Sequence, residues 1–291
     1  MIATRTFSPE TRAEALVEAL PYIKKFQGAI IVIKLGGNAM TDPALTKSFA
    51  EDVVLLRSVG LSPVVVHGGG PQIADHLEKL GIESRFQNGL RVTDEETLDV
   101  VRMILVGKVG RDIVGAINVH GAYAVGLSGE DGGLITAAPH GDALGLVGKI
   151  VSIDPGIVRR LIAENMIPVV STIGSDRTGQ AYNINADTVA GSLAAALGAE
   201  KVIYLTDVPG LLEDVSDPES LIQRTTPAEV ESMLLTDSIG SGMMPKGEAC
   251  VEAVRAGTPS AHMLDGTVPH VLLLELLTDA GIGTMITEQA S

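Results

Sequence analysis

The chain has 291 residues and a formal net charge of −15, from 36 acidic and 21 basic side chains. This charge repels nucleic acids and anionic membranes, so we expect neither as a partner. A single cysteine, Cys250, excludes an intrachain disulfide and a four-cysteine metal site, and it favours a reducing, cytoplasmic location. The apolar runs fall short of the roughly 20 residues that cross a bilayer, and the first 28 residues lack the apolar region of a signal peptide. The length fits one large α/β unit or two lobes sharing a sheet.

The N-terminal segment predicts a helix from Ser8 to about Phe26. Ser8 followed by Pro9 is typical of a helix start. Pro21 lies inside the helical pattern and should kink it, because proline lacks the backbone N–H and clashes with the preceding turn. The apolar stripe of this helix consists of Leu16, Leu20 and Ile23.

Further along, short apolar runs alternate with helical patterns such as those at 43–60 and 71–80. Runs rich in β-branched residues without polar alternation are typical of strands covered by helices on both faces. We therefore predict an α/β fold, an open and mostly parallel three-layer αβα sandwich with right-handed crossovers. The runs are AIIVIKL, PVVVHGGG, AYAVGLS, MIPVVSTI, KVIYLTDV and PSAHMLDG, at residues 29–35, 63–70, 122–128, 166–173, 201–208 and 259–266.

Between these units lie segments that predict hairpins, because Gly, Asn and Asp interrupt their apolar residues. We expect them to form flaps over a site. They are QNGLRVT, GLITAAPHGDALGLVGKIVSID and SDRTGQAYNIN, at residues 87–93, 133–154 and 175–185.

One long helix is predicted from Asp94 to about His120. Thr93 opens it, with Glu96 three residues later in a capping-box arrangement. Three glycines inside it each cost about 1 kcal/mol relative to alanine, so a close approach of other elements should offset them. Packing against the protein's own sheet and a subunit interface both remain open. These glycines are Gly107, Gly110 and Gly115.

Two glycine-rich turns end predicted strands and lead into helices. The first, KLGG, places Lys34 beside backbone N–H groups that suit an anion, and the second, HGGG, ends the next strand. Ligands bind at such turns in open α/β sheets. The nucleotide-binding pattern Gly-x-x-x-x-Gly-Lys-Ser/Thr is absent, and so is the Gly-x-Ser-x-Gly elbow that a hydrolase reading of HGGG would need. His67 is expected to be a buried strand-end residue with a local hydrogen bond.

Other candidate residues carry charge or amide groups in short loops and at helix starts. Arg91 could clamp a substrate carboxylate in a bidentate manner, or form a surface ion pair. In NINAD, a helix N-cap role explains one of the polar groups but not all. Lys246 begins a helix, where the helix dipole disfavours a cation, so we expect it to serve an anion there.

The ordered motifs KLGG, HGGGP, GLRVT, NINAD, LTDVPG and GMMPK together resemble the amino acid kinase family, and within it the members that phosphorylate N-acetyl-L-glutamate. The resemblance runs from Ile30 to the end of the chain. It implies ATP and Mg²⁺ as cofactors, with Mg²⁺ held mainly through the phosphates, and transfer of phosphate to the substrate's side-chain carboxylate in the second step of arginine biosynthesis. It also implies three parts: an N-terminal extension over 1–28, an acetylglutamate lobe with a dimer interface over 29–198, and an ATP lobe over 199–291.

The resemblance also implies roles for individual residues. Lys34 and Lys246 look like the two lysines that neutralise the phosphoryl group in flight, with Asp187 holding both. The acetylglutamate-binding set would be Gly69, Gly70, Arg91 and Asn183, with Arg91 on the α-carboxylate. The nucleotide-binding set would be Gly36, Gly37, Thr206, Asp207 and Gly210, with Ser238 and Gly240 nearby.

Arginine-inhibited members of the family share the N-terminal helical extension and a similar C-terminal region. The resemblance therefore implies arginine as an effector and a homodimer that assembles, through these helices, into a hexamer as a trimer of dimers. A simple docking helix, a catalytically idle arginine sensor on the same fold, and a kinase for another N-blocked amino acid remain alternatives. The arginine-site candidates are Tyr22, His262, Glu275 and Gly281.

Overall fold

A computed structural model describes residues 8–214, 217, 219–235 and 243–289. Its central sheet has the strand order β12-β14-β13-β11-β1-β2-β8-β5. Neighbouring strands are parallel except for β13 and β14, which pair antiparallel. The strands are β1 Ile30–Leu35, β2 Ser62–His67, β5 Ala124–Ser128, β8 Ile167–Ser171, β11 Lys201–Thr206, β12 Arg224–Thr225, β13 Ser260–Asp265 and β14 Thr284–Thr287. The six predicted strands are all confirmed.

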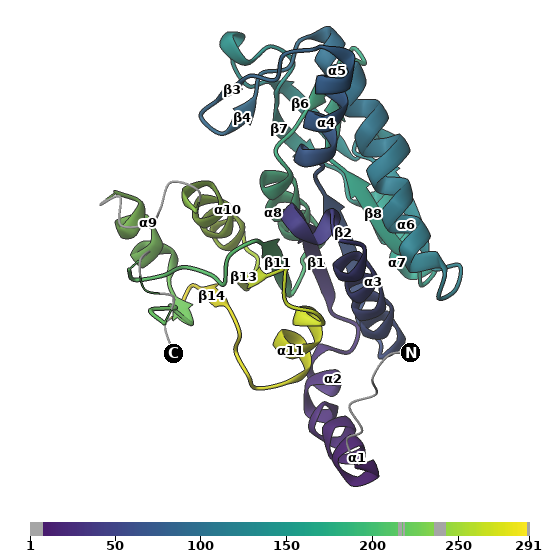
Figure 1. The fold of residues 1–291 in the computed structure, drawn as a ribbon, viewed down its shortest axis with the longest axis vertical. Helices are drawn as coiled ribbons and strands as arrows, with labels where there is room; N and C mark the ends of the chain where they lie inside the picture. Colours follow the sequence, from purple (N-terminus) through teal and green to yellow (C-terminus); the bar gives the residue numbers. More distant parts are fainter. Residues whose placement is uncertain (1–7, 215–216, 218, 236–242, 290–291) are drawn as a thin grey trace.

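Helices cover both faces of this sheet, which confirms the three-layer sandwich (Figure 1). Alternate side chains of β1 show why polar alternation is missing: Ile31 and Ile33 pack into one apolar core, and Val32 packs into the other. The first core is shared with α2 Leu20–Phe26, α3 Pro43–Ser58, α4 Gly70–Leu80, α5 Glu95–Arg102, α6 Gly110–Asn118 and α11 Val271–Leu277, and the second with α7 Gly156–Ala163, α8 Ala186–Leu197, α9 Pro227–Leu235 and α10 Met244–Arg255.

The three predicted hairpins lie beyond the carboxyl ends of the central strands (Figure 1). Two of them form a second sheet, with strand order β10-β9-β6-β7, and the third is the separate pair β3-β4. Because the central strands deliver their glycine turns to the same edge, these hairpins can act as flaps over it. The strands are β3 Phe86–Gln87, β4 Leu90–Arg91, β6 Ile135–Pro139, β7 Gly148–Ile153, β9 Ile173–Ser175 and β10 Ala181–Asn183.

The long helix after β4 begins one residue later than predicted. Its N-cap is Asp94, whose carboxylate accepts a hydrogen bond from the Thr97 N–H at 2.8 Å, so the proposed capping box at Thr93 is wrong. The backbone N–H of Thr93 donates to Leu144 O, and its hydroxyl donates to Arg91 O. Thr93 is therefore held in an extended bridge to another loop, and it cannot also open the helix.

This helix also changes its winding in the middle. A π-helical segment, Met103–Val109, joins α5 to α6 in one continuous rod (Figure 1). Of the three glycines, Gly110 lies against the sheet, because a Cβ there would be 3.3 Å from His67 Nε2. A Cβ at Gly107 or Gly115 would meet no atom of the described chain within 4 Å. Packing against the protein's own sheet thus accounts for Gly110 alone.

The N-terminal extension projects from the body as two helices (Figure 1). The first is α1 Pro9–Glu18, capped by Ser8 Oγ, which accepts from the Thr11 N–H at 3.2 Å. Helix α1 ends at Glu18 and α2 begins at Leu20 with Pro21 in its first turn, in agreement with the predicted kink. Leu16 and Leu20 remain 76% and 45% exposed, while Ile23 packs against the core. In the described part of the chain, no helix is long and apolar enough to span a membrane.

Candidate active site

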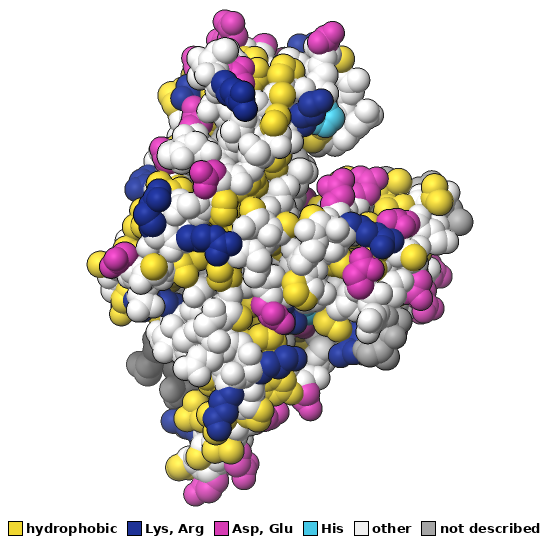
Figure 2. Space-filling model, turned by 180° about the vertical axis from the view of Figure 1, so that it is seen from behind, with side chains coloured by type: hydrophobic (Ala, Val, Ile, Leu, Met, Phe, Trp, Pro, Cys, Tyr) yellow, Lys and Arg dark blue, Asp and Glu magenta, His cyan; other side chains and the backbone are white. Residues whose placement is uncertain are grey.

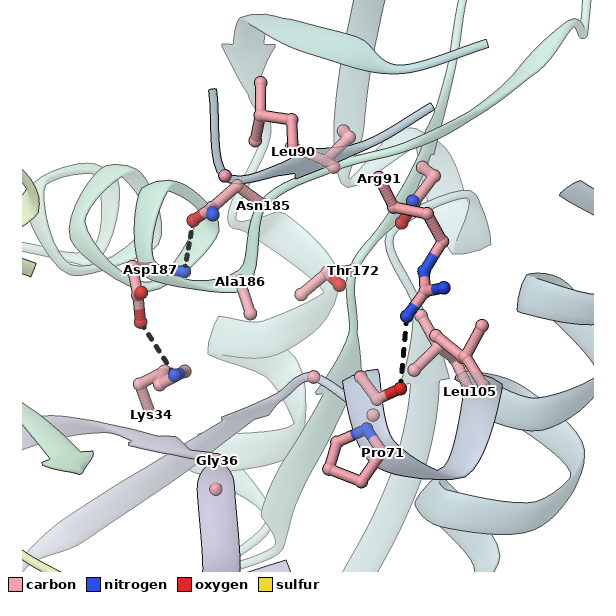
Figure 3. Close-up of a pocket in the computed structure, with 18 of the residues that line it drawn as sticks. Lys34, Gly36, Pro71, Leu90, Arg91, Leu105, Thr172, Asn185, Ala186 and Asp187 are labelled. Carbon is pink, nitrogen blue, oxygen red and sulfur yellow. Dashed lines mark hydrogen bonds and ion pairs between the residues drawn. The ribbon is translucent and has the colours of Figure 1, made fainter. Parts of the chain in front are cut away.

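A cavity of about 280 Å³ lies at the carboxyl ends of β1 and β2, beneath the β3-β4 hairpin. The fold brings eight of the predicted site residues to its wall, from segments that lie far apart in the sequence (Figure 3). These predicted residues combine bare glycine backbone with two cations, one carboxylate and one amide. The eight residues are Lys34, Gly36, Gly37, Gly69, Gly70, Arg91, Asn183 and Asp187.

An ion pair joins the end of β1 to the start of α8. Lys34 Nζ lies 2.8 Å from Asp187 Oδ1, and the two side chains are only 12% and 13% exposed (Figure 3). Asn185 is the helix N-cap and accepts hydrogen bonds from the Asp187 and Thr188 N–H groups. Because Asp187 stands in the first turn, the helix dipole stabilises its negative charge. The lysine is thus held at a set position on the cavity wall.

In the first glycine turn, the side chains of Lys34 and Asp207 already occupy the positions that a Cβ would take. A Cβ at Gly36 would lie 2.5 Å from Lys34 Nζ, because the lysine folds back over this residue. Gly37 adopts φ +61°, and a Cβ there would overlap the Asp207 carboxylate. The turn continues into the 3₁₀ segment Gly37–Met40, and Asp42 then caps α3. Backbone N–H groups are therefore the surface that this turn presents to a ligand.

The second glycine turn leads from β2 into α4. Gly69 is the N-cap of α4, and a Cβ there would lie 2.7 Å from Leu105 Cδ2. The imidazole Nδ1 of His67 hydrogen-bonds to Gly68 O at 2.9 Å, and burial lowers the pKa of His67 to about 4. This confirms the structural reading of His67, which is neutral at physiological pH. Gly70 remains open toward the cavity.

Arg91 is held by the residues around it. Its guanidinium donates to Gly70 O at 3.2 Å and to the hydroxyl of Ser84, and it stacks over the Phe86 ring with 4.6 Å between the guanidinium carbon and the ring centre. Burial lowers the pKa of Arg91, although the side chain stays charged. A planar, charged donor in this setting is suited to a carboxylate. The surface-ion-pair alternative is wrong, because Arg91 is a buried residue of the cavity wall.

Phe86 and Ser84 were missed by the sequence analysis. A signal for Phe86 was nevertheless present, since Asn88-Gly89 between two strands is the pattern of a two-residue hairpin turn. Both turn residues have positive φ, and the resulting register places Phe86 directly opposite Arg91. The hydroxyl of Ser84 precedes the hairpin, and no comparable pattern points to it.

Several predicted nucleotide residues lie in the C-terminal half of the sheet, outside this cavity. Thr206 Oγ1 accepts from the Val208 N–H at 3.0 Å and so orders the turn that follows β11. A Cβ at Gly210 would lie 2.5 Å from Thr284 Oγ1, so packing against β14 accounts for this glycine. Lys246 lies in the first turn of α10, as predicted. Ser238 and Gly240 lie outside the described residues.

A second cavity, of about 420 Å³, separates the hairpins from α10. Figure 2 shows a notch in this part of the molecule, with basic and histidine side chains on one edge and acidic side chains on the other. His140 and Lys149 line the cavity from the hairpin side, and Glu248 and Glu252 line it from α10. Asn185 lines both cavities, so the two spaces adjoin at the start of α8.

Two of the four predicted effector residues, His262 of β13 and Glu275 of α11, meet in the structure. His262 Nδ1 lies 2.8 Å from Glu275 Oε1, and its Nε2 lies 2.9 Å from Lys201 Nζ. Burial lowers the pKa of His262, and it lowers the pKa of Lys201 to about 8. Burial alone would raise the pKa of Glu275, but the hydrogen bond and the positive charges of His262 and Lys201 outweigh it, so that the pKa of Glu275 is lowered. Lys201 was not predicted, and it also stacks over the Phe26 ring of α2. Tyr22 packs on the neighbouring core, and Gly281 follows α11 with φ +52°.

The described residues contain no site at which side chains alone could hold a metal ion. Among them, no group of three or more His, Cys, Asp or Glu side chains is placed to hold an ion. The site is instead rich in backbone N–H groups and cations, a donor set that suits phosphate and carboxylate groups.

The chain matches curated proteins over almost its whole length. Residues 29–265 match the family model described as the amino acid kinase family. The acetylglutamate kinase of Saccharopolyspora erythraea is 53% identical over 98% of this chain and 96% of its own length. That of Methanothermobacter thermautotrophicus is 53% identical over 94% of this chain and 98% of its own length.

Solved structures share the fold. N-acetylglutamate synthase from Neisseria gonorrhoeae, complexed with coenzyme A and N-acetyl-glutamate, superposes with a TM-score of 0.83 at 27% identity, and the match covers 96% of this chain but 64% of that longer one. Carbamate kinase from Giardia lamblia, bound to AMP-PNP, superposes with a TM-score of 0.68 at 18% identity over 90% of this chain and 99% of its own. The chain therefore belongs to the amino acid kinase family, in the group of the curated acetylglutamate kinases.

Proposed function

We propose that this protein transfers the γ-phosphoryl group of ATP to the side-chain carboxylate of N-acetyl-L-glutamate, the second step of arginine biosynthesis. The products are N-acetyl-L-glutamyl 5-phosphate and ADP. The observation that carries the proposal is the cavity in which the Lys34–Asp187 pair, two glycine turns and Arg91 converge. The acetylglutamate kinases that match almost the whole chain support the same acceptor.

The reaction needs no general base. A glutamate carboxylate has a pKa of about 4.3 and is already ionised at neutral pH. One of its oxygens forms a bond to the γ-phosphorus, and the bond between that phosphorus and the β,γ-bridging oxygen breaks, so that ADP leaves with the bonding electrons. The main obstacle is repulsion between an anion and a polyanion. Lys34 and the N–H groups of Gly36 and Gly37 are placed to stabilise the transferred charge.

ATP and Mg²⁺ fit the residues present. The turn at Gly36 and Gly37 lines the cavity with bare backbone beside the Lys34 ammonium group, which suits close approach of phosphate oxygens. Bound Mg²⁺ would supply further neutralisation of the phosphates and would be held mainly through them. We assign Lys246 to the same task from the ATP lobe, and the loop of Thr206, Asp207 and Gly210, with Ser238 and Gly240, to the nucleotide.

We assign the acceptor to the other end of the cavity. Arg91 receives the α-carboxylate, because its guanidinium lies on the wall in a buried and fixed orientation. Gly70 contributes open backbone, and Gly69 lines the same wall as the N-cap of α4. Asn183 contributes its amide, which also donates to Thr93 Oγ1 at 3.3 Å. The lobe that binds the acceptor would span residues 29–198, and the ATP lobe residues 199–291.

We further propose feedback inhibition by arginine at the cluster around Glu275. The carboxylate of Glu275 could receive a guanidinium, because the cluster joins α11 to β13 and its Lys201 stacks over Phe26 of the N-terminal extension. We include Tyr22 and Gly281 in the proposed site. The idle arginine sensor is less favoured, because a sensor would not need the Lys34–Asp187 pair.

The assembly we propose is a homodimer that associates into a hexamer. The α5–α6 rod presents an exposed face with Met103, Val106, Gly107 and Gly115, which would suit contact with a second copy. The exposed leucines of α1 and α2, Leu16 and Leu20, support a second contact between dimers. Sedimentation of the full chain and of a chain lacking residues 1–28 tests both contacts.

The deciding experiment traps the acyl phosphate as a hydroxamate, with ATP and N-acetylglutamate, glutamate, aspartate or N-acetyl-aminoadipate, each with and without arginine. Turnover with acetylglutamate that arginine suppresses supports both parts of the proposal. Turnover that ignores arginine removes the inhibition and leaves the kinase. No turnover with any acceptor favours the sensor.

A further inference from the structure

Helix α11 takes its N-terminal support from a distant part of the chain. Its own N-cap, His270, offers no side-chain hydrogen bond to the helix and adopts φ +59°, which is unusual for a residue with a Cβ. Ser48 and Asp52 of α3 supply the missing contacts. The His270 N–H donates to Ser48 Oγ at 2.8 Å, and His270 Nδ1 lies 2.6 Å from Asp52 Oδ1. We call these three residues the clasp.

The clasp is costly to form, and the proposed chemistry does not use it. Asp52 is only 1% exposed, and burial raises the pKa of its carboxyl to about 6. A left-handed histidine adds backbone strain of the order of 1 kcal/mol. Such features persist where the surrounding structure holds them in place, and they concentrate near functional sites.

The segment that the clasp fastens lies against the continuation, Gly37–Met40, of the first glycine turn, which we call the phosphate turn. This segment, residues 266–270, starts where the Gly266 N–H donates to Thr206 O at 2.7 Å. A Cβ at Gly266 would lie 3.4 Å from the Ala39 Cβ, in the 3₁₀ segment that continues the turn. From the other side, Thr46 Oγ1 of α3 donates to Ala39 O at 3.1 Å. The turn is therefore braced between α3 and residues 266–270.

The joint between these elements is tightly packed. The space between Ala39, Ser48, Asp52 and His270 amounts to about 10 Å³, which is too small for a ligand. A movement of residues 266–270 would therefore be transmitted to Ala39. This matters because the turn is built on Gly36 and Gly37, whose backbone has more freedom than that of other residues.

We propose that Asp52, with Ser48 and His270, is a positioning residue that holds the phosphate turn in the geometry that binds ATP. The inference rests on the proposed function for the role of the turn at Gly36 and Gly37. According to this proposal, the buried Asp52 carboxylate, which does not line the acceptor cavity, affects the binding of the nucleotide and not that of the acceptor.

The test compares Asp52→Ala, Asp52→Asn and Ser48→Ala with the wild-type full chain. Lys47→Ala is the matched control, because Lys47 lies on the same helix and its side chain is 69% exposed. We measure KM for ATP, KM for N-acetylglutamate and kcat, and the Kd of AMP-PNP by calorimetry. Asp52→Ala should raise both nucleotide constants about tenfold. KM for acetylglutamate should change less than about twofold in all variants.

The conservative variants separate positioning from general destabilisation. Asp52→Asn keeps an acceptor oxygen and should show a smaller rise than Asp52→Ala, and Ser48→Ala should also raise the nucleotide constants. An unchanged AMP-PNP Kd together with a lower Tm, or an equal rise in both KM values, would overturn the clasp proposal. If Asp52→Ala fails to fold, the other two variants give the same readings.

The proposal and the proposed function fail separately. A wild-type protein that binds AMP-PNP but phosphorylates no acceptor contradicts the function, and AMP-PNP titration of the variants still decides the clasp. A wild-type protein that does not bind AMP-PNP overturns the clasp.

Discussion

Asp187 holds the Lys34 ammonium group at 2.8 Å and thereby joins the end of β1 to the first turn of α8. The pair brings a cation to the wall of the cavity and prevents it from moving into solvent. A nearly buried pair also means that removal of either partner leaves an uncompensated charge. The arrangement suits a site in which charge develops during the reaction.

We expect Asp187→Asn to lower kcat by about 10²–10³, because the lysine loses its anchor at the point of phosphoryl transfer. Lys34→Met should lower kcat by a similar factor, and the double variant should be little worse than either single one, since the two residues act as a unit. Steady-state kinetics of the three variants check this. Lys47→Met, which breaks a surface ion pair of α3, is the control and should stay near wild type. Additive losses in the double variant would separate the two roles.

Gly37→Ala should weaken ATP binding. The new Cβ would overlap the Asp207 carboxylate, and an alanine at φ +61° also costs about 1 kcal/mol of stability. Gly28→Ala is the matched control, because Gly28 has φ +78° and a Cβ there meets no described atom within 4 Å. Both variants should lose similar stability in urea titrations, but KM for ATP should rise in Gly37→Ala alone. Equal KM values would show that the turn tolerates a side chain.

Arg91 and Phe86 should act on the acceptor and leave the nucleotide unaffected. Arg91→Lys should raise KM for N-acetylglutamate by more than about tenfold, since a lysine cannot bind a carboxylate in a bidentate manner. Phe86→Ala should raise it by about two- to fivefold, the size of a cation–π contact at an exposed site. Phe86 is 59% exposed, so the loss of core packing is small. Phe86→Tyr keeps an aromatic face and should give a KM for N-acetylglutamate near that of the wild type. If Arg91→Lys or Phe86→Ala raised KM for ATP instead, the two residues would not belong to the acceptor site.

Asp52 gives the protein a pH-dependent stability that can be isolated. Its folded pKa of about 6 lies above the ordinary value of 3.8, so between these values the folded protein binds a proton that the unfolded chain has released. The Asp52 contribution is therefore fully present below pH 4, falls as the pH rises through 6, and amounts to about 3 kcal/mol in total. The charged groups that act on it are His270 and Glu51.

Urea unfolding of wild type and Asp52→Asn from pH 4 to 7 measures this contribution, because the asparagine does not titrate. As the pH rises, the free energy of unfolding of the wild type should fall relative to that of Asp52→Asn. A difference that stays constant over this range would show that Asp52 ionises at its ordinary pH.

The sequence by itself determined the features that depend on neighbouring residues. The unbroken apolar run at Ile31, Val32 and Ile33 predicted a strand buried on both faces, and Pro21 predicted a break in the first helix. The glycine turns after β1 and β2 and the Asn88-Gly89 hairpin were also readable. Each of these follows from backbone sterics or from periodic burial, which act over a few residues.

Only the tertiary structure decided which distant groups meet. Asp52 and His270 are separated by 218 positions, and no local pattern indicates that a carboxylate of α3 supports the start of α11. Likewise, threonine is a residue type that often caps helices, but the Thr93 N–H donates to Leu144 O in a distant loop, and Asp94 is the N-cap instead. Local sterics and periodicity determine which helix or strand a segment can form. Which segments then contact one another depends on how the strands and helices assemble into one sheet with two covering layers, and burial of apolar surface in both cores drives that assembly.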